Sequence, residues 1–195
     1  MVLCEDTRVT GKLFKRYGIE TRMLSFHQHN EHRLLETIVT RIAGGELTGL
    51  VSDAGMPGIS DPAFLLVRAC VEHGVPVEAL PGPTAFVPAL VASGIPCDRF
   101  CFEGFLPVKK GRKTRLESLL SESRTMVFYE SPHRLAKTLK DLSNFLGPDR
   151  NTCISREISK LHEARYRGSL ADLHAAFAAK TVKGEITIVV AGKDD

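Results

Sequence analysis

Short apolar runs alternate with longer segments in which apolar residues recur three or four positions apart through the first half of the chain. One such segment lies between Asn30, a good N-cap residue, and Gly44, which ends the pattern. Its apolar residues share one helical face: Leu34, Leu35, Ile38 and Ile42. The pattern predicts strands at 2–4, 22–26, 47–52 and 75–80, and helices at 10–17, 30–43, 62–73 and 84–93.

Strands that alternate with helices indicate a parallel sheet with right-handed crossovers. The sequence Gly94-Ile95-Pro96 interrupts this alternation, so we expect a domain boundary there, with domains at 1–95 and 96–195. In the second half we expect strands at 100–105, 125–130, 151–156, 163–167 and 185–191. Helices are expected from about 114, from Pro132 to about 145, and at 169–179 with Ser169 as the cap.

Two loops rich in glycine and proline follow expected strands, at 51–62 and 80–85. Gly55, Gly58 and Gly82 allow positive φ or close approach to a ligand, and the prolines stiffen the loops. Asp53 and Asp61 offer hydrogen-bond acceptors for ribose hydroxyls or an amine. Because ligands of open α/β sheets bind at the carboxyl ends of strands, the loops predict one crevice for a nucleoside-sized molecule. The simpler alternative is a pair of ordinary turns with Asp61 as a helix cap.

Composition is that of an ordinary soluble globular protein, with 43% hydrophobic and 25% charged residues among 195. No apolar run approaches membrane-spanning length and no signal peptide is visible. The five cysteines are scattered without a C-x-x-C pair, which favours reduced, mostly buried thiols and a cytoplasmic location.

The formal net charge of +3 predicts no nucleic-acid partner by itself, but one segment is strongly basic. It carries five cations in seven residues: Lys109, Lys110, Arg112, Lys113 and Arg115. Such a cluster is either the solvated start of a helix or a contact for the phosphates of a nucleic acid.

Three histidines follow the expected strand at 22–26, namely His27, His29 and His32. Imidazoles at this spacing are able to hold zinc. No cysteine cluster or further ligand set accompanies them, so we expect no metal and favour hydrogen-bonding or RNA-contacting histidines.

The order of motifs then resembles a known superfamily. The matching segments of the first half are 5–8 (EDTR), 27–31 (HQHNE), 52–57 with 61–62 (SDAGMP, DP) and 80–83 (LPGP). Those of the second half are 98–107 (DRF, EGFLP), 128–134 (FYES, HR), 156–160 (RE, K) and 183–185 (KGE). Together they resemble the class III methyltransferases of the tetrapyrrole methylase fold, and within them the bacterial enzymes that 2′-O-methylate a cytidine of 16S rRNA.

The resemblance implies a two-domain α/β fold, with a parallel-sheet N-terminal domain and a mixed-sheet C-terminal domain. It also implies S-adenosylmethionine as cofactor, folded in a cleft between the domains. The residues expected to contact it are Ser52, Asp53, Ala54, Gly55, Ile59, Thr84, Ala85, Tyr129, Glu130 and Glu157.

A sulfonium methyl group is already electrophilic, so the protein has mainly to orient the 2′-hydroxyl, and a general base assists. The candidates for that base are Glu5, Asp6, His27, His29 and Lys160. Arg8 and the basic segment 109–115 are expected to contact RNA; for 5–8, a helix-capping acid–arginine pair is the alternative. The implied partners are the small ribosomal subunit and a second copy in a homodimer, with no membrane.

Family members carry a further strand, a Pro-Ile-Gly-Asn-type loop and a helix before the segment that matches 5–8, so the N-terminal domain is expected to be shortened here. Two alternative hypotheses stay open, of which the second rests on this shortening. One is C-methylation of a tetrapyrrole on the same fold, which expects a roomy apolar cleft without a basic rim. The other is a catalytically incomplete fragment of the fold, which would bind the methyl donor poorly.

Overall fold

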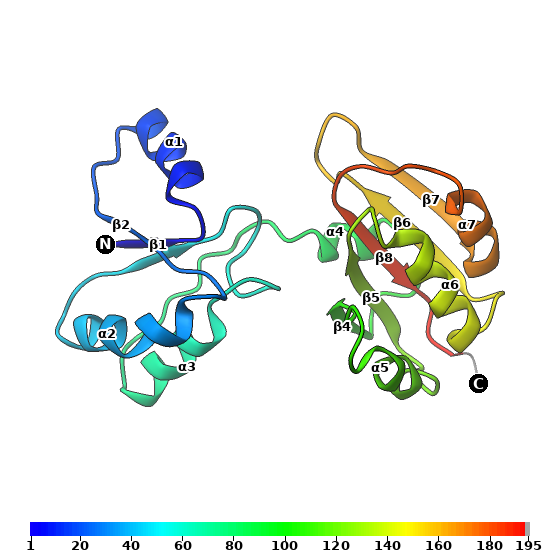
Figure 1. The fold of residues 1–195 in the computed structure, drawn as a ribbon, viewed down its shortest axis with the longest axis horizontal. Coiled ribbons are helices and arrows are strands. Elements are labelled where there is room, and N and C mark those ends of the chain that lie inside the picture. The colour runs from blue at the N-terminus through cyan, green and yellow to red at the C-terminus, as the bar shows by residue number, and fades with distance from the viewer. Residues whose placement is uncertain (194–195) are drawn as a thin grey trace. The chain divides into compact units, whose positions relative to one another are not determined.

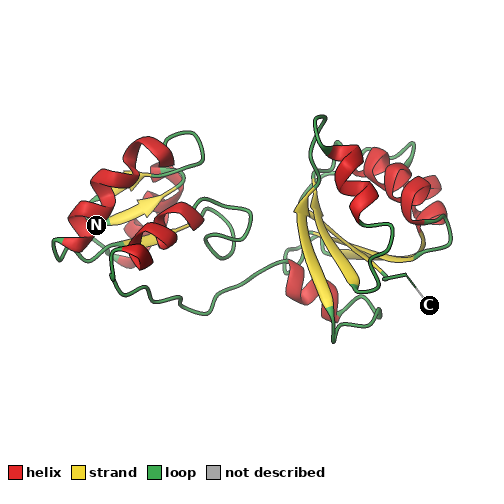
Figure 2. Cartoon of the chain, turned by 90° about the horizontal axis from the view of Figure 1, so that it is seen from below, coloured by secondary structure: helices red, strands yellow, loops and turns green. Residues whose placement is uncertain are grey.

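The computed structural model describes residues 1–193, and the chain divides into one compact unit at Met1–Thr84 and a second from Ala85 onward (Figure 1). Figure 2 shows that each unit contains its own sheet. The N-terminal sheet is wholly parallel and the C-terminal sheet is mixed, which confirms the predicted α/β class. No helix within the described residues is long and apolar enough to cross a membrane.

The N-terminal unit has a three-stranded sheet in the order β2-β1-β3. Its strands are β1 (Val2–Cys4), β2 (Met23–Ser25) and β3 (Gly49–Val51). Its helices are α1 (Thr7–Tyr17), α2 (Glu31–Ala43) and α3 (Phe64–Glu72). Figure 1 shows α1 on one side of the sheet and α2 with α3 on the other.

Alternation along β1 explains this arrangement, since neighbouring side chains of a strand point to opposite faces. Leu3 packs with Ile38 of α2 and Leu66 of α3 in one buried cluster. On the other side, α1 buries Thr10 and Phe14. Gly18 ends α1 in the left-handed conformation (φ 64°), and its N–H donates to the Phe14 carbonyl.

The C-terminal unit has a five-stranded sheet in the order β4-β5-β8-β6-β7, in which only β4 and β5 are parallel. Its strands are β4 (Phe100–Phe105), β5 (Thr125–Glu130), β6 (Asn151–Arg156), β7 (Ala164–Ser169) and β8 (Ile186–Val190). Its helices are α4 (Phe86–Val91), α5 (Arg112–Ser118), α6 (Leu135–Leu146) and α7 (Leu170–Phe177).

Both faces of this sheet are covered. On one face Met126, Phe128 and Ile188 pack against the apolar sides of α5, α6 and α7. On the other face Val127 and Val189 pack against Ala89 and Leu90 of α4. The predicted cap of α7 is confirmed, since the Ser169 hydroxyl accepts the N–H of Asp172.

The division lies before α4, whereas the break at Gly94-Ile95-Pro96 suggested a boundary at 95. The reason is that Leu90 and Ile95 belong to the same buried cluster as Val127, so α4 folds with the C-terminal sheet.

The predicted strand at 75–80 is wrong, because this segment forms no ladder in the structure. Pro76 removes a backbone donor from it, Pro81 follows it directly, and only Val75 of this segment packs on the core of the N-terminal unit. Asn30 precedes α2 as predicted but makes no side-chain cap. Its amide instead accepts from the His27 N–H (2.9 Å) and donates to the Ser25 carbonyl (3.0 Å).

Candidate functional site

Three loops leave the N-terminal sheet at one edge because its strands are parallel and in register. Cys4 of β1 lies opposite Ser25 of β2 and Val51 of β3. The chain therefore brings the residues after each strand together: Glu5 and Asp6, the histidine segment from His27, and the loop from Ser52. This is the edge where open α/β sheets bind ligands.

Glu5 joins the neighbouring loops at this edge. Its carboxylate accepts the N–H of Asp53 at 3.0 Å, and its carbonyl accepts the Ser25 hydroxyl at 3.1 Å. Glu5 was predicted as a possible base, and the structure gives it a part in shaping the loop that holds Ser52, Asp53 and Ala54.

The loop 52–62 turns back on itself through three residues with positive φ: Gly55 (82°), Gly58 (84°) and Ser60 (68°). The Ser52 hydroxyl donates to the Gly55 carbonyl at 2.8 Å. A Cβ on Gly55 would stand 3.3 Å from the Pro83 carbonyl oxygen, so the two glycine- and proline-rich loops lie side by side. Their adjacency is consistent with the single crevice that the sequence predicts, and the crevice itself stays a prediction. Asp53, Ala54 and Gly55 are exposed, and Ile59 is half-buried.

Asp61 is the most perturbed carboxyl group at this edge. Burial, followed by the charges of Glu5 and Asp53, raises the pKa of Asp61 to about 6. The sequence marked Asp61 as a hydrogen-bond acceptor but did not suggest that it titrates near neutrality. A base of this pKa is well suited to proton transfer, because it is largely ionised at neutral pH yet still basic.

Asp6 and Arg8 adopt the capping arrangement that the sequence left open. Asp6 precedes α1 and its carboxylate accepts the backbone N–H of Arg8 at 2.8 Å. The Arg8 guanidinium pairs with the same carboxylate, with Nη2 at 2.6 Å from Oδ2. These bonds lower the pKa of Asp6 to about 2, which makes it a poor base.

His27 and His29 lie close together after β2, with ring centroids 5.8 Å apart. The His29 N–H donates to Nδ1 of His27 at 3.3 Å, so that nitrogen is the acceptor. His32 is exposed on α2. Among the described residues no group of three or more His, Cys, Asp or Glu side chains is arranged to hold a metal ion.

In the C-terminal unit, Tyr129 and Glu130 end β5. The Tyr129 hydroxyl accepts the Phe86 N–H at 3.3 Å, and its ring meets those of Phe102 and Phe105 edge to face. Thr84 and Ala85 stand where one unit ends and the other begins, with Ala85 preceding the first residue of α4.

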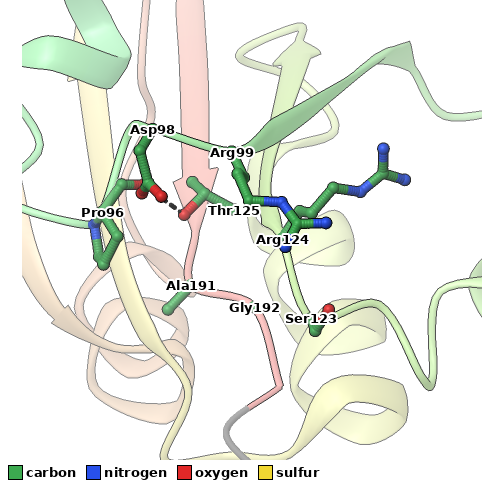
Figure 3. Close-up of a pocket in the computed structure, with 8 residues that line it drawn as sticks. All are labelled: Pro96, Asp98, Arg99, Ser123, Arg124, Thr125, Ala191 and Gly192. Atoms are coloured by element: carbon green, nitrogen blue, oxygen red, sulfur yellow. Dashed lines mark hydrogen bonds between the residues drawn. The ribbon is translucent and has the colours of Figure 1, made fainter.

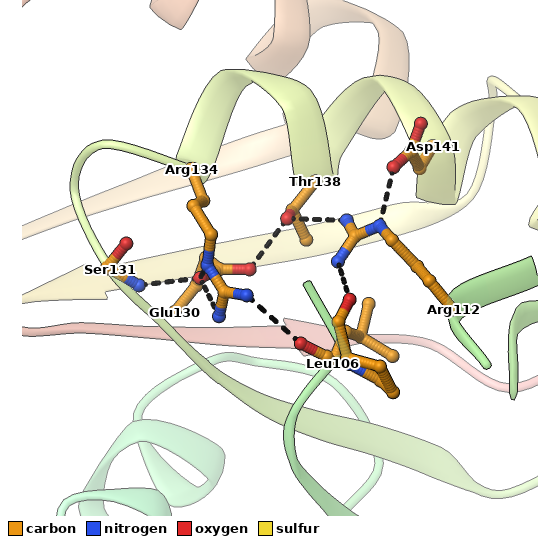
Figure 4. Close-up of polar contacts among 8 residues, drawn as sticks. Leu106, Arg112, Glu130, Ser131, Arg134, Thr138 and Asp141 are labelled. Atoms are coloured by element: carbon orange, nitrogen blue, oxygen red, sulfur yellow. Dashed lines mark hydrogen bonds and ion pairs between the residues drawn. The ribbon is translucent and has the colours of Figure 1, made fainter. Parts of the chain in front are cut away.

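Glu130 is directed into the C-terminal unit, where a polar network surrounds its buried carboxylate (Figure 4). It accepts from the Ser131 N–H (2.7 Å), Arg134 Nε (2.7 Å) and the Thr138 hydroxyl (2.6 Å). Each carboxylate oxygen is thus engaged within this unit. The structure supports a role for Glu130 in fixing the start of α6, and its predicted contact with the cofactor stays a prediction.

Glu157 and Lys160 lie in the loop between β6 and β7. Glu157 has φ 52°, and its Oε1 accepts from the Glu185 N–H (2.8 Å) and from Lys160 Nζ (3.1 Å). These bonds lower the pKa of Glu157. Burial lowers the pKa of Lys160, but its hydrogen bonds with Glu157 and Glu185 outweigh that effect and raise it. Lys160 therefore stays protonated, which disfavours its predicted part as a base.

The basic segment after β4 does not act as one surface. Arg112 is buried, contrary to the expected phosphate contact, with Nε 2.8 Å from Asp141 Oδ2 and Nη2 2.8 Å from the Thr138 hydroxyl. Arg115 pairs with Glu103, and Lys113 lies 3.6 Å from Glu117. Lys109 and Lys110 remain exposed.

The cysteines are unpaired as predicted, and Cys4, Cys70 and Cys153 are buried.

A pocket of about 190 Å³ lies between the starts of β4 and β5 and the end of β8 (Figure 3). It is lined by Asp98, Arg99, Arg124 and Thr125, among others. None of the predicted site residues lines it.

Comparison with known proteins agrees with this arrangement. Residues 1–174 match the family of Tetrapyrrole (Corrin/Porphyrin) Methylases. The chain is 46% identical over 193 residues to ribosomal RNA small subunit methyltransferase I of Synechocystis sp., covering 98% of this chain and 69% of that protein. It is 43% identical over 194 residues to the protein of the same name from Thermotoga maritima, covering 100% of this chain and 87% of that protein.

Solved structures share the fold. The methyltransferase CobJ matches with a TM-score of 0.64 and 21% identity, over 98% of this chain and 92% of that one. Uroporphyrin-III C-methyl transferase from Thermus thermophilus, complexed with S-adenyl homocysteine, matches with a TM-score of 0.59 and 23% identity, over 98% and 84%.

The fold and these matches define an S-adenosylmethionine-dependent methyltransferase of the tetrapyrrole methylase family, to which the chain belongs. Within that family it belongs with the ribosomal RNA small subunit methyltransferase I proteins, as the resemblance in the sequence indicated.

Proposed function

We propose that the chain transfers the methyl group of S-adenosylmethionine to the ribose 2′-hydroxyl of a cytidine in 16S rRNA of the small ribosomal subunit. The identity of 43% to relatives named ribosomal RNA small subunit methyltransferase I supports the substrate. The structural observation that supports the chemistry is Asp61, an acid with pKa about 6 at the ligand-binding edge of the N-terminal sheet.

The residues at this edge fit the methyl donor. Gly55 and Gly58 hold the loop 52–62 in left-handed turns that leave its backbone exposed. Asp53 supplies an exposed carboxylate for ribose hydroxyls or the amino group of the donor, and Ser52 holds the turn through the Gly55 carbonyl. When bound, the donor supplies an electrophilic methyl group. Thr84, Ala85, Tyr129, Glu130 and Glu157 remain proposed further contacts.

We assign the general base to Asp61. Its carboxylate would accept the proton of the 2′-hydroxyl as that oxygen becomes a nucleophile. Among the earlier candidates, Asp6 is held at low pKa by Arg8 and Lys160 carries a proton already. Burial, followed by the charges of Glu5 and Asp53, raises the pKa of Asp61 and keeps its carboxyl group basic enough for this task.

The test is methyl transfer from labelled S-adenosylmethionine to small ribosomal subunits that lack the modification. We expect label in RNA as an alkali-resistant 2′-O-methyl nucleotide. Asp61→Asn should lower kcat by about 10² to 10⁴, the usual contribution of a general base, with little effect on donor affinity. Asp149→Asn is the matched control, because Asp149 is an exposed aspartate in the loop before β6.

Uroporphyrinogen and precorrin-type compounds belong in the same assay, because the fold is shared with enzymes named for such substrates. Label in a tetrapyrrole instead of RNA would refute the proposal. Absence of transfer together with weak donor binding would favour the catalytically incomplete fragment. A homodimer and a cytoplasmic location accompany the proposal as further expectations.

A further inference from the structure

Helix α1 carries a strongly one-sided set of charges. The segment Thr7–Tyr17 contains no acidic residue, and its cations beyond Arg8 are Lys12, Lys15 and Arg16. Lys15 and Arg16 lie three and four positions after Lys12, so each of them neighbours Lys12 on the helix surface. All three are exposed, on the side opposite the buried Thr10 and Phe14.

These cations are available to a partner. Within the described residues, none of the three cations takes part in an ion pair or a side-chain hydrogen bond. Arg8, in contrast, is paired with Asp6. Figure 1 shows α1 alone on its side of the N-terminal sheet, with α2 and α3 on the other side. The cationic side of α1 therefore faces solvent within this unit.

The basic segment 109–115 has fewer cations that are both exposed and unpaired. There Arg112 is buried, Arg115 is paired with Glu103, and Lys113 stands near Glu117. Two of its five cations, Lys109 and Lys110, are left exposed and unpaired. The helix thus presents more unpaired positive charge on one surface than the segment that the sequence singled out.

We propose that the face of α1 formed by Lys12, Lys15 and Arg16 binds the phosphate backbone of the RNA substrate; this inference rests on the proposed function. The start of α1 is fixed by Asp6, directly after β1, so the helix originates at the same sheet edge as Glu5 and Asp53. The three cations lie in the second half of α1, which runs back towards the opposite edge because β1 and β2 are parallel. RNA bound to them has to follow the helix to bring its backbone to the edge where the methyl donor is proposed to bind. Exposed Tyr17, at the end of the helix, offers an aromatic surface for an unstacked base.

Binding of small ribosomal subunits is to be measured at several salt concentrations for the wild type and for Lys12→Gln/Lys15→Gln. The matched control is Lys137→Gln/Lys140→Gln, which removes the same charge from two exposed lysines at the same spacing on α6. Removing two phosphate contacts should weaken binding about tenfold and lower the slope of log K against log salt by about 2. The control should keep the affinity and slope of the wild type, and Arg16→Gln should add to the first effect.

Donor binding separates this inference from the proposed function. All variants should bind S-adenosylmethionine within about twofold of the wild type, since none of these side chains is among the residues proposed to contact it. If both double variants bind and methylate subunits normally, or lose affinity equally, the assignment to α1 is overturned and the proposed function stands.

If the wild type neither binds nor methylates RNA, the proposed function falls and this inference falls with it. The apolar residues Val9 and Leu13 are also exposed on α1, so vesicles containing anionic lipid serve as a third arm. Suppose that the protein binds vesicles only when Lys12 and Lys15 are present, while its binding to RNA does not depend on them. This result would overturn the inference in favour of a membrane surface.

Discussion

The carboxylate of Glu5 accepts the backbone N–H of Asp53 at 3.0 Å, across 48 positions of the chain. This bond joins the residue after β1 to the loop after β3, and so sets the course of the loop on which the donor is proposed to rest. The negative charge of Glu5 also helps to raise the pKa of Asp61. One side chain therefore affects both the shape of the candidate site and its proton affinity.

Glu5→Gln separates these two effects, because the amide oxygen still accepts a hydrogen bond while the charge is lost. Burial is the main reason that the pKa of Asp61 is about 6, and Glu5 is the next contribution. We expect the pKa of Asp61 to fall towards, but not reach, its ordinary value of 3.8. Titration of the Asp61 carboxyl carbon by NMR measures this. An unchanged pKa would mean that burial and Asp53 account for the shift alone.

Asp61 also predicts a dependence of stability on pH. Its folded pKa lies above the unfolded value, so the folded state binds more protons between about pH 4 and 6. This group therefore lowers the free energy of unfolding as pH rises through that range, and the loss is complete above it. Asp61→Asn removes this titration. The free energy of unfolding of the variant minus that of the wild type should therefore be higher at about pH 8 than at about pH 4. Urea unfolding at both pH values tests the sign, and a constant difference would contradict it.

The sequence predicted those elements whose apolar residues are continuous. Strands β4, β5 and β6 have the predicted bounds. β5 and β6 are buried along most of their length, whereas β4, at the edge of the sheet, is half-buried or exposed. The segment 75–80 has a similar apolar content but contains Pro76, is followed by Pro81 and finds no strand to pair with. Pairing partners are a tertiary property, which the local pattern does not contain.

The candidate site shows the same limit. The sequence located the loop 52–62 at the edge of the N-terminal sheet, since the end of β3 and the glycine-rich turns are visible in it. The loop 80–85 lies beside it without the strand that was expected to precede it. It did not distinguish Arg112, which is buried, from Lys110, which is exposed, because the path of the chain after β4 decides which cation turns inward. Nor did it show the raised pKa of Asp61, which depends on burial first and then on Glu5 and Asp53 nearby in space.

Substitution of Gly184 should destabilise the protein because of its positive φ and the nearby side chain of Glu157. Its φ is 94°, and a Cβ there would stand 2.5 Å from the side chain of Glu157. Gly184→Ala should cost about 1 to 2 kcal/mol of stability and displace the Glu157 carboxylate from the Glu185 N–H. Thermal unfolding measures the first effect.

Gly11→Ala is the control for Gly184→Ala. Gly11 lies inside α1 with only Met23 within contact distance, and alanine there should stabilise the protein by about 0.5 to 1 kcal/mol. Equal effects at the two positions would show that neither φ nor Glu157 matters.

Arg112 should act through stability and not through RNA. Its guanidinium pairs with Asp141 and also bonds the Thr138 hydroxyl and the Pro107 carbonyl (3.1 Å), as Figure 4 shows for the first two. Arg112→Ala removes this partner from Asp141 and the Pro107 carbonyl, while the Thr138 hydroxyl keeps its bond to Glu130. We expect the free energy of unfolding to fall by about 3 kcal/mol in urea titrations.

Lys110→Ala is the matched control for Arg112→Ala, because Lys110 is an exposed cation two positions away and its loss should change stability by less than about 0.5 kcal/mol. At a temperature where Arg112→Ala is folded, its RNA affinity should keep the salt dependence of the wild type, because a guanidinium inside the protein releases no counterions from phosphate. The opposite pattern, full stability with a reduced salt slope, would return Arg112 to the RNA-binding surface and contradict the buried network around Thr138.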